Sequence, residues 1–158
     1  MDLVGVTVAI ALGANLGDRR AHLEAAVDLL APHVSGLRVS SLIETDPVDV
    51  PGEQPPYLNG AVVGVTTLEP RALLDVLMAI EARLGRTRPV HHAPRTVDLD
   101  LILYGDRQLD EPGLTVPHPA FRVRRFVLAP LAEIAPDLRD PVTGLTVAEL
   151  EFRTRTEP

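Results

Sequence analysis

The stretch Arg95–Leu103, Arg-Thr-Val-Asp-Leu-Asp-Leu-Ile-Leu, alternates apolar and acidic side chains from residue 97 to residue 101. On a β-strand, this alternation sends Asp98 and Asp100 to one face and the apolar residues around them to the other. Two carboxylates on one rigid strand suit Mg²⁺, which binds one or two protein carboxylates and takes its other oxygens from water and substrate phosphates. A half-buried strand that only turns two charges toward water shows the same alternation. The stretch therefore predicts a strand and leaves a metal-dependent phosphoryl site as one of two interpretations.

Segments with strand and helix character surround this stretch in a regular order. The expected strands cover residues 4–12, 37–45, 57–67 and 95–103, and the expected helices cover 21–31 and 70–84. Strand, helix, two strands, helix, strand is the order of a split βαβ unit, which predicts an antiparallel sheet with helices packed on it. After this unit we expect a short helix or loop at 121–125, a helix or short strand at 126–134 and a short helix at 145–150.

The connection after the first expected strand reads Gly13-Ala14-Asn15-Leu16-Gly17-Asp18. Glycine and asparagine permit a tight turn, and Asp18 is placed to cap the helix that follows. A glycine-containing turn before a helix can bind phosphate, but this one lacks the Gly-Lys-Ser/Thr ending of a P-loop and the full spacing of a dinucleotide fingerprint. We therefore interpret residues 13–18 as a connecting turn.

The composition predicts a single soluble domain over residues 1–158. A chain of 158 residues that is 46% hydrophobic is long enough for one core and too short for two ordinary domains. The chain opens without a basic region, and no apolar stretch reaches the length of a membrane span, so we expect a cytoplasmic protein. Because the sequence contains no cysteine, a metal would be held by carboxylate or imidazole groups, which favours a hard cation.

The formal net charge of −7 argues against a nucleic-acid-binding protein with a broadly basic surface. The aromatic content of 3% is also low for an RNA-binding module. All fifteen basic residues are arginine, and seven of them fall into two groups, Arg83, Arg86, Arg88 and Arg95, and Arg122, Arg124 and Arg125. A compositional bias of the host explains the choice of arginine but not the grouping. The two groups predict local anion sites in an acidic protein.

Asparagine, glutamine and tyrosine each occur twice in this chain, yet Gln54, Tyr57 and Asn59 fall within six residues. An asparagine offers a heterocycle both a donor and an acceptor, and an aromatic ring can stack on it. A junction between turn and strand that merely tolerates polar groups explains the same residues. His118 stands between two prolines, which fix its direction and suit a phosphate donor, although a loop histidine without a role is the commoner case.

Six blocks of residues stand in order along most of the chain: Thr45-Asp46-Pro47, Gln54-Pro55-Pro56-Tyr57-Leu58-Asn59, Ile80-Glu81, Gly85-Arg86-Thr87-Arg88, Pro94-Arg95-Thr96-Val97-Asp98-Leu99-Asp100 and Leu114-Thr115-Val116-Pro117-His118. Together they resemble the 6-hydroxymethyl-7,8-dihydropterin pyrophosphokinase family of folate biosynthesis. The resemblance implies a ferredoxin-like α/β (α+β) fold and transfer of the β,γ-diphosphate of ATP to the hydroxymethyl oxygen of the pterin, releasing AMP. One departure is His91-His92-Ala93, which stands where the family commonly has Arg-Trp-Gly.

The resemblance also implies roles for individual residues. Asp98 and Asp100 would hold two Mg²⁺ ions that bridge the triphosphate, and Arg86 and Arg95 would contact the transferring phosphates. The ATP side would be formed by Glu81, Arg88, Leu101, His118 and Arg124. The pterin side would be formed by Thr45, Val48, Tyr57, Asn59 and Phe126. Alignment and charge neutralisation are what phosphoryl transfer chiefly requires, and metal ions with guanidinium groups supply both.

The implied partners are ATP and 6-hydroxymethyl-7,8-dihydropterin, bound by a monomer that uses neither nucleic acid nor a membrane. A non-catalytic nucleotide- or ligand-binding module on the same fold is the alternative, because split βαβ domains host many functions. Such a module would bind ATP without consuming it, whereas the enzyme would release AMP only when the pterin is present. A metal-dependent nuclease would also use two aspartates, but it gives no reason for Tyr57 and Asn59.

Overall fold

An antiparallel five-stranded sheet lies at the centre of the structure, a computed structural model that describes residues 5–15, 17–45, 56–85 and 97–156. Its strands are β1 (Val6–Ala14), β2 (Ser35–Val39), β3 (Ile43–Thr45), β4 (Tyr57–Thr66) and β5 (Asp98–Tyr104). They lie in the order β2-β4-β1-β5, and β3 also pairs with β4. One helix follows β1 and another follows β4 along the chain. This arrangement is that of a split βαβ unit, so the predicted α+β class is confirmed.

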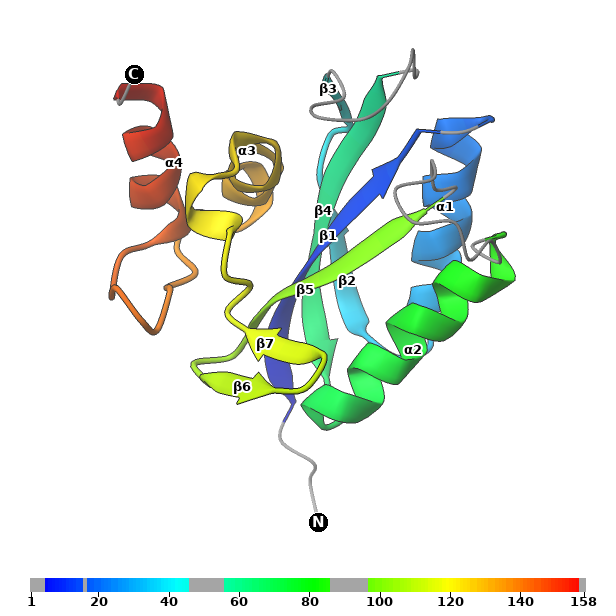
Figure 1. Cartoon of the computed structure of the whole chain (residues 1–158), viewed down its shortest axis with the longest axis horizontal. Helices are drawn as coiled ribbons and strands as arrows, with labels where there is room; N and C mark the ends of the chain where they lie inside the picture. Colours follow the sequence, from blue (N-terminus) through cyan, green and yellow to red (C-terminus); the bar gives the residue numbers. More distant parts are fainter. Residues whose placement is uncertain (1–4, 16, 46–55, 86–96, 157–158) are drawn as a thin grey trace.

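Helices lie on both sides of the sheet (Figure 1). One side holds α1 (Arg19–Leu30) and α2 (Pro70–Arg83), and the other holds α3 (Arg125–Ile134) with α4 (Val147–Thr156) packed beside it. Between β5 and α3 the chain forms the hairpin β6 (Leu109–Glu111) and β7 (Leu114–Val116) and the 3₁₀ helix η1 (Phe121–Val123). Within the described residues, no helix has both the length and the apolar character needed to cross a membrane.

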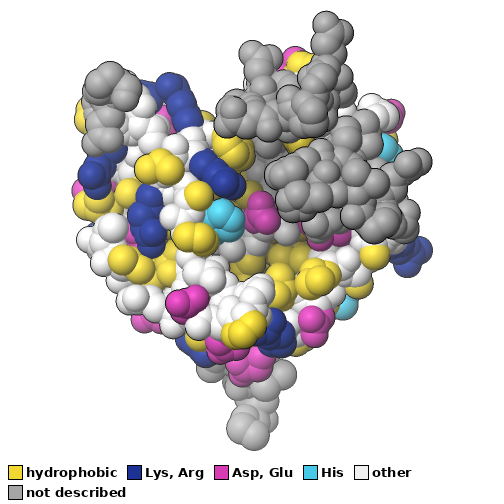
Figure 2. Space-filling view, in the orientation of Figure 1, with side chains coloured by type: hydrophobic (Ala, Val, Ile, Leu, Met, Phe, Trp, Pro, Cys, Tyr) yellow, Lys and Arg dark blue, Asp and Glu magenta, His cyan; other side chains and the backbone are white. Residues whose placement is uncertain are grey.

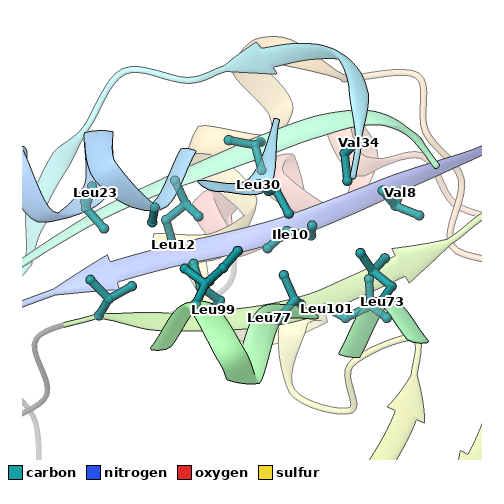
Figure 3. Packing of buried hydrophobic residues seen from close by; sticks show 14 of the residues in the cluster. Val8, Ile10, Leu12, Leu23, Leu30, Val34, Leu73, Leu77, Leu99 and Leu101 are labelled. Atoms are coloured by element: carbon teal, nitrogen blue, oxygen red, sulfur yellow. The ribbon is translucent and has the colours of Figure 1, made fainter. Parts of the chain in front are cut away.

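The sheet face toward α1 and α2, which we call the closed face, is filled by apolar side chains (Figure 3). β1 contributes Ile10 and Leu12, β5 contributes Leu99, and the helices contribute Leu23 and Leu77; none of the five is more than 5% exposed. The buried residues of α1 and α2 recur every three or four positions, which gives each helix one apolar stripe. These stripes pack against alternate residues of the strands. The closed face is therefore an ordinary sandwich of sheet and helices.

The sheet face toward α3, which we call the open face, carries a second and smaller core. Phe121 of η1 and Leu128 of α3 are fully buried there against small residues of the strands. Ile102 and Leu103 both belong to this core although they are neighbours in β5. The register explains this, because Ala9 pairs with Leu103 while the next residue of β1 pairs with Leu101, so that Ile102 is an extra residue, a β-bulge.

The single strand expected over 37–45 is instead two short strands, β2 and β3. Ser40 lies between them, and its hydroxyl accepts a hydrogen bond of 2.8 Å from the backbone N–H of Ala61, while its own N–H donates to the carbonyl of Ala61 at 2.9 Å. A side-chain oxygen thus replaces a ladder carbonyl at this point. The sequence signal for this break is weak because serine is also compatible with an uninterrupted strand.

The connecting turn expected at 13–18 is shorter than predicted. Gly13 and Ala14 belong to β1, where they pair with Asn59 and Leu58 of β4. Asp18 caps α1 as expected, since its carboxylate accepts the backbone N–H of Ala21 at 3.1 Å. The extension of β1 brings Gly13 into the sheet, where it contributes to the site described below.

Candidate active site

The centre of the site is the end of the open face where β4, β1 and β5 lie side by side. Gly13 of β1 pairs with Asn59 on one side and with Asp98 on the other, and Ala11 pairs with Ala61 and Asp100 in the same way. Side chains of directly paired residues project from the same face of an antiparallel sheet. The middle strand therefore presents almost no side chain here, and polar side chains stand on either side of it.

A cavity of about 580 Å³ lies over this floor. Seven residues that the sequence assigned to the site line it, namely Thr45, Tyr57, Asn59, Asp98, Asp100, Arg124 and Phe126. They come from β3, β4, β5, the residue before α3 and the first turn of α3. The remaining wall is formed by Ala11, Leu12, Gly13 and Val127. Residues separated by up to 116 positions in the chain, Ala11 and Val127, thus meet around one cavity, although Leu12 points mainly into the closed-face core.

The β5 side of the cavity is charged. Asp98 is partly buried and Asp100 is exposed, and they project from the same face of β5 as alternate residues. The pKa of His118 is lowered, chiefly by burial. Asp100 opposes this change and Arg124 adds to it, so the imidazole lies within electrostatic reach of both side chains. Figure 2 shows acidic, basic and histidine side chains side by side on this face of the molecule. An acid pair beside cationic and neutral donors is suited to a metal-bound polyphosphate.

Backbone contacts fix the orientation of His118. Its Nδ1 accepts the backbone N–H of Ala120 at 3.2 Å, and its own backbone N–H donates to the carbonyl of Ile102 at 3.0 Å. Because Nδ1 acts as an acceptor, the neutral imidazole carries its proton on Nε2. His118 therefore presents a neutral N–H donor that is anchored to β5 through Ile102.

The side chains that β3 and β4 contribute to the cavity are polar but uncharged. The Nδ2 of Asn59 donates a hydrogen bond of 2.5 Å to Oγ1 of Thr45, and Asn59 is only 6% exposed. This bond leaves the Asn59 carboxamide with a defined orientation, with Oδ1 close to Gly13. Phe126, which is 38% exposed, carries the guanidinium of Arg124 at 5.8 Å from its ring centre. The β4 side thus combines oriented amide and hydroxyl groups with aromatic surface, as a flat heterocycle requires.

Three of the described residues that were assigned to the site are not part of the lining of the cavity: Glu81, Leu101 and His118, which lies within electrostatic reach of Asp100 and Arg124. Leu101 belongs to the closed-face core. Glu81, near the end of α2, is 5% exposed, and its Oε2 accepts the backbone N–H of Leu99 at 2.8 Å. Its carboxylate therefore ties α2 to β5 between the two aspartates of the site.

Four further assigned residues, Val48, Arg86, Arg88 and Arg95, lie outside the described residues, and so do His91 and His92. Within the described residues, no cluster of three or more histidine, cysteine, aspartate or glutamate side chains is arranged as a metal site. Two carboxylates are nevertheless a suitable donor set for Mg²⁺, which takes most of its oxygen ligands from water and phosphate. Asp98 and Asp100 fit that requirement because they share one strand face beside the cavity.

The sequence did not identify the floor of the cavity. Gly13 was assigned to a turn, and Ala11 to an apolar strand without a role in the site. The signal was the alternation of small and bulky residues in β1, but its meaning depends on the register that places Gly13 between Asn59 and Asp98. A strand pairing of this kind joins residues that are about 45 and 85 positions apart, which a local pattern does not specify.

The sequence matches a family model described as 7,8-dihydro-6-hydroxymethylpterin-pyrophosphokinase (HPPK) over residues 9–136. Among similar proteins, the 2-amino-4-hydroxy-6-hydroxymethyldihydropteridine pyrophosphokinase of Synechocystis sp. is 46% identical over 89% of this chain and 72% of its own length. Proteins of the same name from Pseudomonas aeruginosa and Bacillus subtilis are 46% and 47% identical; each match covers 85% of this chain, and 83% and 81% of those proteins.

Solved structures show the same fold at lower sequence identity. The wild-type HPPK-DHPS of Plasmodium falciparum matches with a TM-score of 0.75 and 16% identity, over 96% of this chain. The chain spans 45% of that longer protein. At this identity the likeness concerns the fold alone.

Proposed function

The chain belongs to the 7,8-dihydro-6-hydroxymethylpterin-pyrophosphokinase family, and we propose that it transfers the diphosphate of ATP to the hydroxymethyl oxygen of 6-hydroxymethyl-7,8-dihydropterin. The products are the pterin diphosphate and AMP, an intermediate step of folate biosynthesis. One observation carries the proposal: a single cavity has two acidic side chains on its β5 side and the Thr45–Asn59 pair with Tyr57 on its β4 side. The acidic side suits a metal-bound nucleotide polyphosphate, and the side with Thr45, Asn59 and Tyr57 suits a flat heterocycle.

Asp98 and Asp100 hold the magnesium in this proposal. Two Mg²⁺ ions, when bound, supply charge neutralisation on the triphosphate and a template for in-line attack. The two aspartates contribute a rigid pair of oxygen ligands, because β5 is paired along its length with β1 and its backbone is tied to Glu81 at Leu99. The strand therefore fixes where the phosphates lie relative to the pterin.

His118 and Arg124 contact the phosphates beside the two aspartates. The guanidinium of Arg124 supplies a fixed positive charge and paired N–H donors for phosphate oxygens. His118 donates from Nε2 without a net charge, since Nδ1 is occupied by the N–H of Ala120. A separate strong base is not required in this scheme, because alignment and charge neutralisation supply most of the acceleration of phosphoryl transfer. Arg86, Arg88 and Arg95 remain phosphate ligands predicted from the family resemblance.

The pterin binds on the β4 side. Asn59 and Thr45 present oriented polar groups to the edge of the heterocycle, and the aromatic rings of Tyr57 and Phe126 lie against its faces. Val48 is expected to contribute through its backbone, and Glu81 and Leu101 are expected near the nucleoside. We further expect the protein to act as a monomer in the cytoplasm, with ATP and the pterin as its partners.

The test is an AMP-release assay with ATP, Mg²⁺ and 6-hydroxymethyl-7,8-dihydropterin. We expect AMP only in the complete mixture and none in controls that lack the pterin or the metal. ATP binding without AMP release in the complete mixture would instead favour a non-catalytic nucleotide-binding module. AMP release that does not depend on the pterin would indicate a different acceptor.

A further inference from the structure

Arg19, the first residue of α1, joins the two strands that form the pterin side of the cavity. Its Nη1 donates a hydrogen bond of 2.6 Å to the carbonyl of Pro56, and its Nη2 donates one of 2.7 Å to Oε1 of Glu44. Glu44 lies in β3 directly before Thr45, and Pro56 lies directly before Tyr57, the first residue of β4. One guanidinium therefore connects the residues that precede two lining residues of the cavity.

Arg19 makes these contacts from the side of the sheet opposite the cavity. Thr45 pairs with Tyr57 and both line the cavity, whereas Glu44 pairs with Leu58, which belongs to the closed-face core. Alternate residues of a strand project from opposite faces, so Glu44 points away from the cavity. Arg19 thus acts on the site through the backbone of β3 and β4.

The start of α1 holds the guanidinium in this place. Asp18 caps the helix through the N–H of Ala21, and Gly17 before it has a φ of 63°, a left-handed conformation that favours glycine. The side chain of Arg19 is only 25% exposed, whereas that of Glu44 is 60% exposed. An exposed ion pair contributes little by itself, but a guanidinium with two Nη donors bridges two acceptors at once, which one ammonium group does not do with the same geometry.

We propose that Arg19 is a positioning residue for pterin binding: its bridge between Glu44 and Pro56 fixes the separation of β3 and β4 and thereby the Thr45–Tyr57 pair that faces the pterin. The inference rests on the proposed function and adds a residue outside the cavity to it. Because two strands, β4 and β1, separate β5 and its aspartates from β3, the effect is confined to the pterin side.

Arg19→Gln removes the bridge, and steady-state kinetics with each substrate varied separately measure the result. We expect the KM for 6-hydroxymethyl-7,8-dihydropterin to rise about tenfold, as for the loss of a charge-assisted hydrogen bond, while kcat and the KM for ATP stay within about twofold. Arg20→Gln is the matched control, since it removes the same charge from the next, exposed residue of α1. Assays at 20 °C, with melting temperatures recorded for every variant, separate positioning from partial unfolding.

Glu44→Gln and the double variant Arg19→Gln/Glu44→Gln complete a cycle on the dissociation constant of the pterin, measured with a non-hydrolysable ATP analogue bound. We expect the double variant to bind the pterin about as weakly as Arg19→Gln alone, because both changes act on one bridge. Additive losses, equal changes in both KM values, or an Arg20→Gln defect of the same size would overturn the inference. If wild-type protein releases no AMP, the proposed function fails, whereas active wild type with normal pterin binding by Arg19→Gln overturns only the role of Arg19.

Discussion

The two faces of the sheet are built from the same strands but are covered differently. On the closed face, Ile10 and Leu12 of β1 pack against α1 and α2. On the open face, Ala11 and Gly13, which alternate with these residues, lie in the floor of the cavity. The layer formed by α3 and α4 covers the other part of this face, where Ala9, Val63 and Leu103 are buried. One strand thus supplies bulky side chains to a core and small ones to a site.

The position of α3 determines where the core ends and the site begins. Phe126, in its first turn, lines the cavity, Val127 borders both the cavity and the open-face core, and Leu128 and Leu131 are buried in that core. Apolar packing holds both layers, and each also has polar contacts with the sheet, such as that of Glu81 with Leu99 on the closed face and that of Glu133 with Ser41 on the open face. Because the cavity lies on the open face, we expect substitutions of its lining to alter catalysis, and truncations in the closed-face core to alter stability.

The largest effect is expected from Asp98→Ala on the open face. Loss of a metal ligand should lower kcat by at least about 10³-fold, equivalent to about 4 kcal/mol, because metal binding supplies several kcal/mol to phosphoryl transfer. The melting temperature should stay close to that of wild type, and Asp106→Ala, an exposed residue just after β5, is the control. Near-normal turnover of Asp98→Ala would remove the aspartate pair from the mechanism.

Leu77→Ala tests the closed face and, in contrast to Asp98→Ala, should lower stability while leaving kcat nearly unchanged. Leu77 is fully buried in the core between α2 and the sheet, so its truncation should lower the free energy of unfolding by about 3 kcal/mol. Below the midpoint of unfolding, kcat should remain within about twofold of wild type. Met78→Ala, on the exposed side of the same helix, is the control and should cost well under half as much. A large fall in kcat at full folding would show that the two faces are coupled.

An ion pair between the partly exposed Arg122 and the buried Asp140 attaches the segment after α3 to η1, and it should make the open-face layer sensitive to acid. Asp140 is completely buried and accepts hydrogen bonds from Nε and Nη2 of Arg122, from Oγ1 of Thr143 and from the N–H of Val142. Burial alone raises the pKa of Asp140, but these hydrogen bonds outweigh burial and lower the pKa to about 2. The folded state therefore favours the ionised carboxylate.

Because the pKa of Asp140 is depressed on folding, its contribution is complete above about pH 4 and is lost as the pH falls toward 2. The shift corresponds to about 2 kcal/mol of the free energy of unfolding. Asp140→Asn should lose about this amount at pH 7, and the difference from wild type should shrink between pH 4 and pH 2. Urea unfolding at several pH values measures it, with the exposed Asp137→Asn as control. A difference that stays constant down to pH 2 would contradict the expected pKa.

The smallest effect is expected from Gly13→Ala in the floor of the cavity. A methyl group at Gly13 would lie 3.3 Å from Oδ1 of Asn59, so the carboxamide must move by a few tenths of an ångström. Such a displacement should raise the KM for the pterin about three- to tenfold and leave the KM for ATP nearly unchanged. Gly13→Val should enlarge the defect. Unchanged KM values for the pterin in both variants would contradict this prediction and show that the cavity accommodates a side chain over β1 without displacing Asn59.

The sequence predicted the parts of this molecule that local periodicity determines. The alternation around Asp98 and Asp100 placed both carboxylates on one strand face, and the order of elements gave the topology of the sheet. The break at Ser40 and the role of Gly13 were missed, because both depend on which residue of β4 lies opposite. Asp140 was missed for a similar reason, since its partner Arg122 is 18 residues away and the pairing follows from the packing of η1.

The extra residue at Ile102 also bears on which changes of length β5 can accept. Residues before the bulge present carboxylates to the open face, and Leu103 after it returns to that same face. Removing Ile102 would therefore leave all the remaining side chains of β5 on their present faces. Removing one residue between Asp98 and Leu101 would instead move the side chains on one side of the deletion to the opposite face. Evolution or design can thus shorten β5 by one residue at the bulge and keep the frame of the acidic pair, at the loss of one packed side chain and of the carbonyl that accepts the backbone N–H of His118.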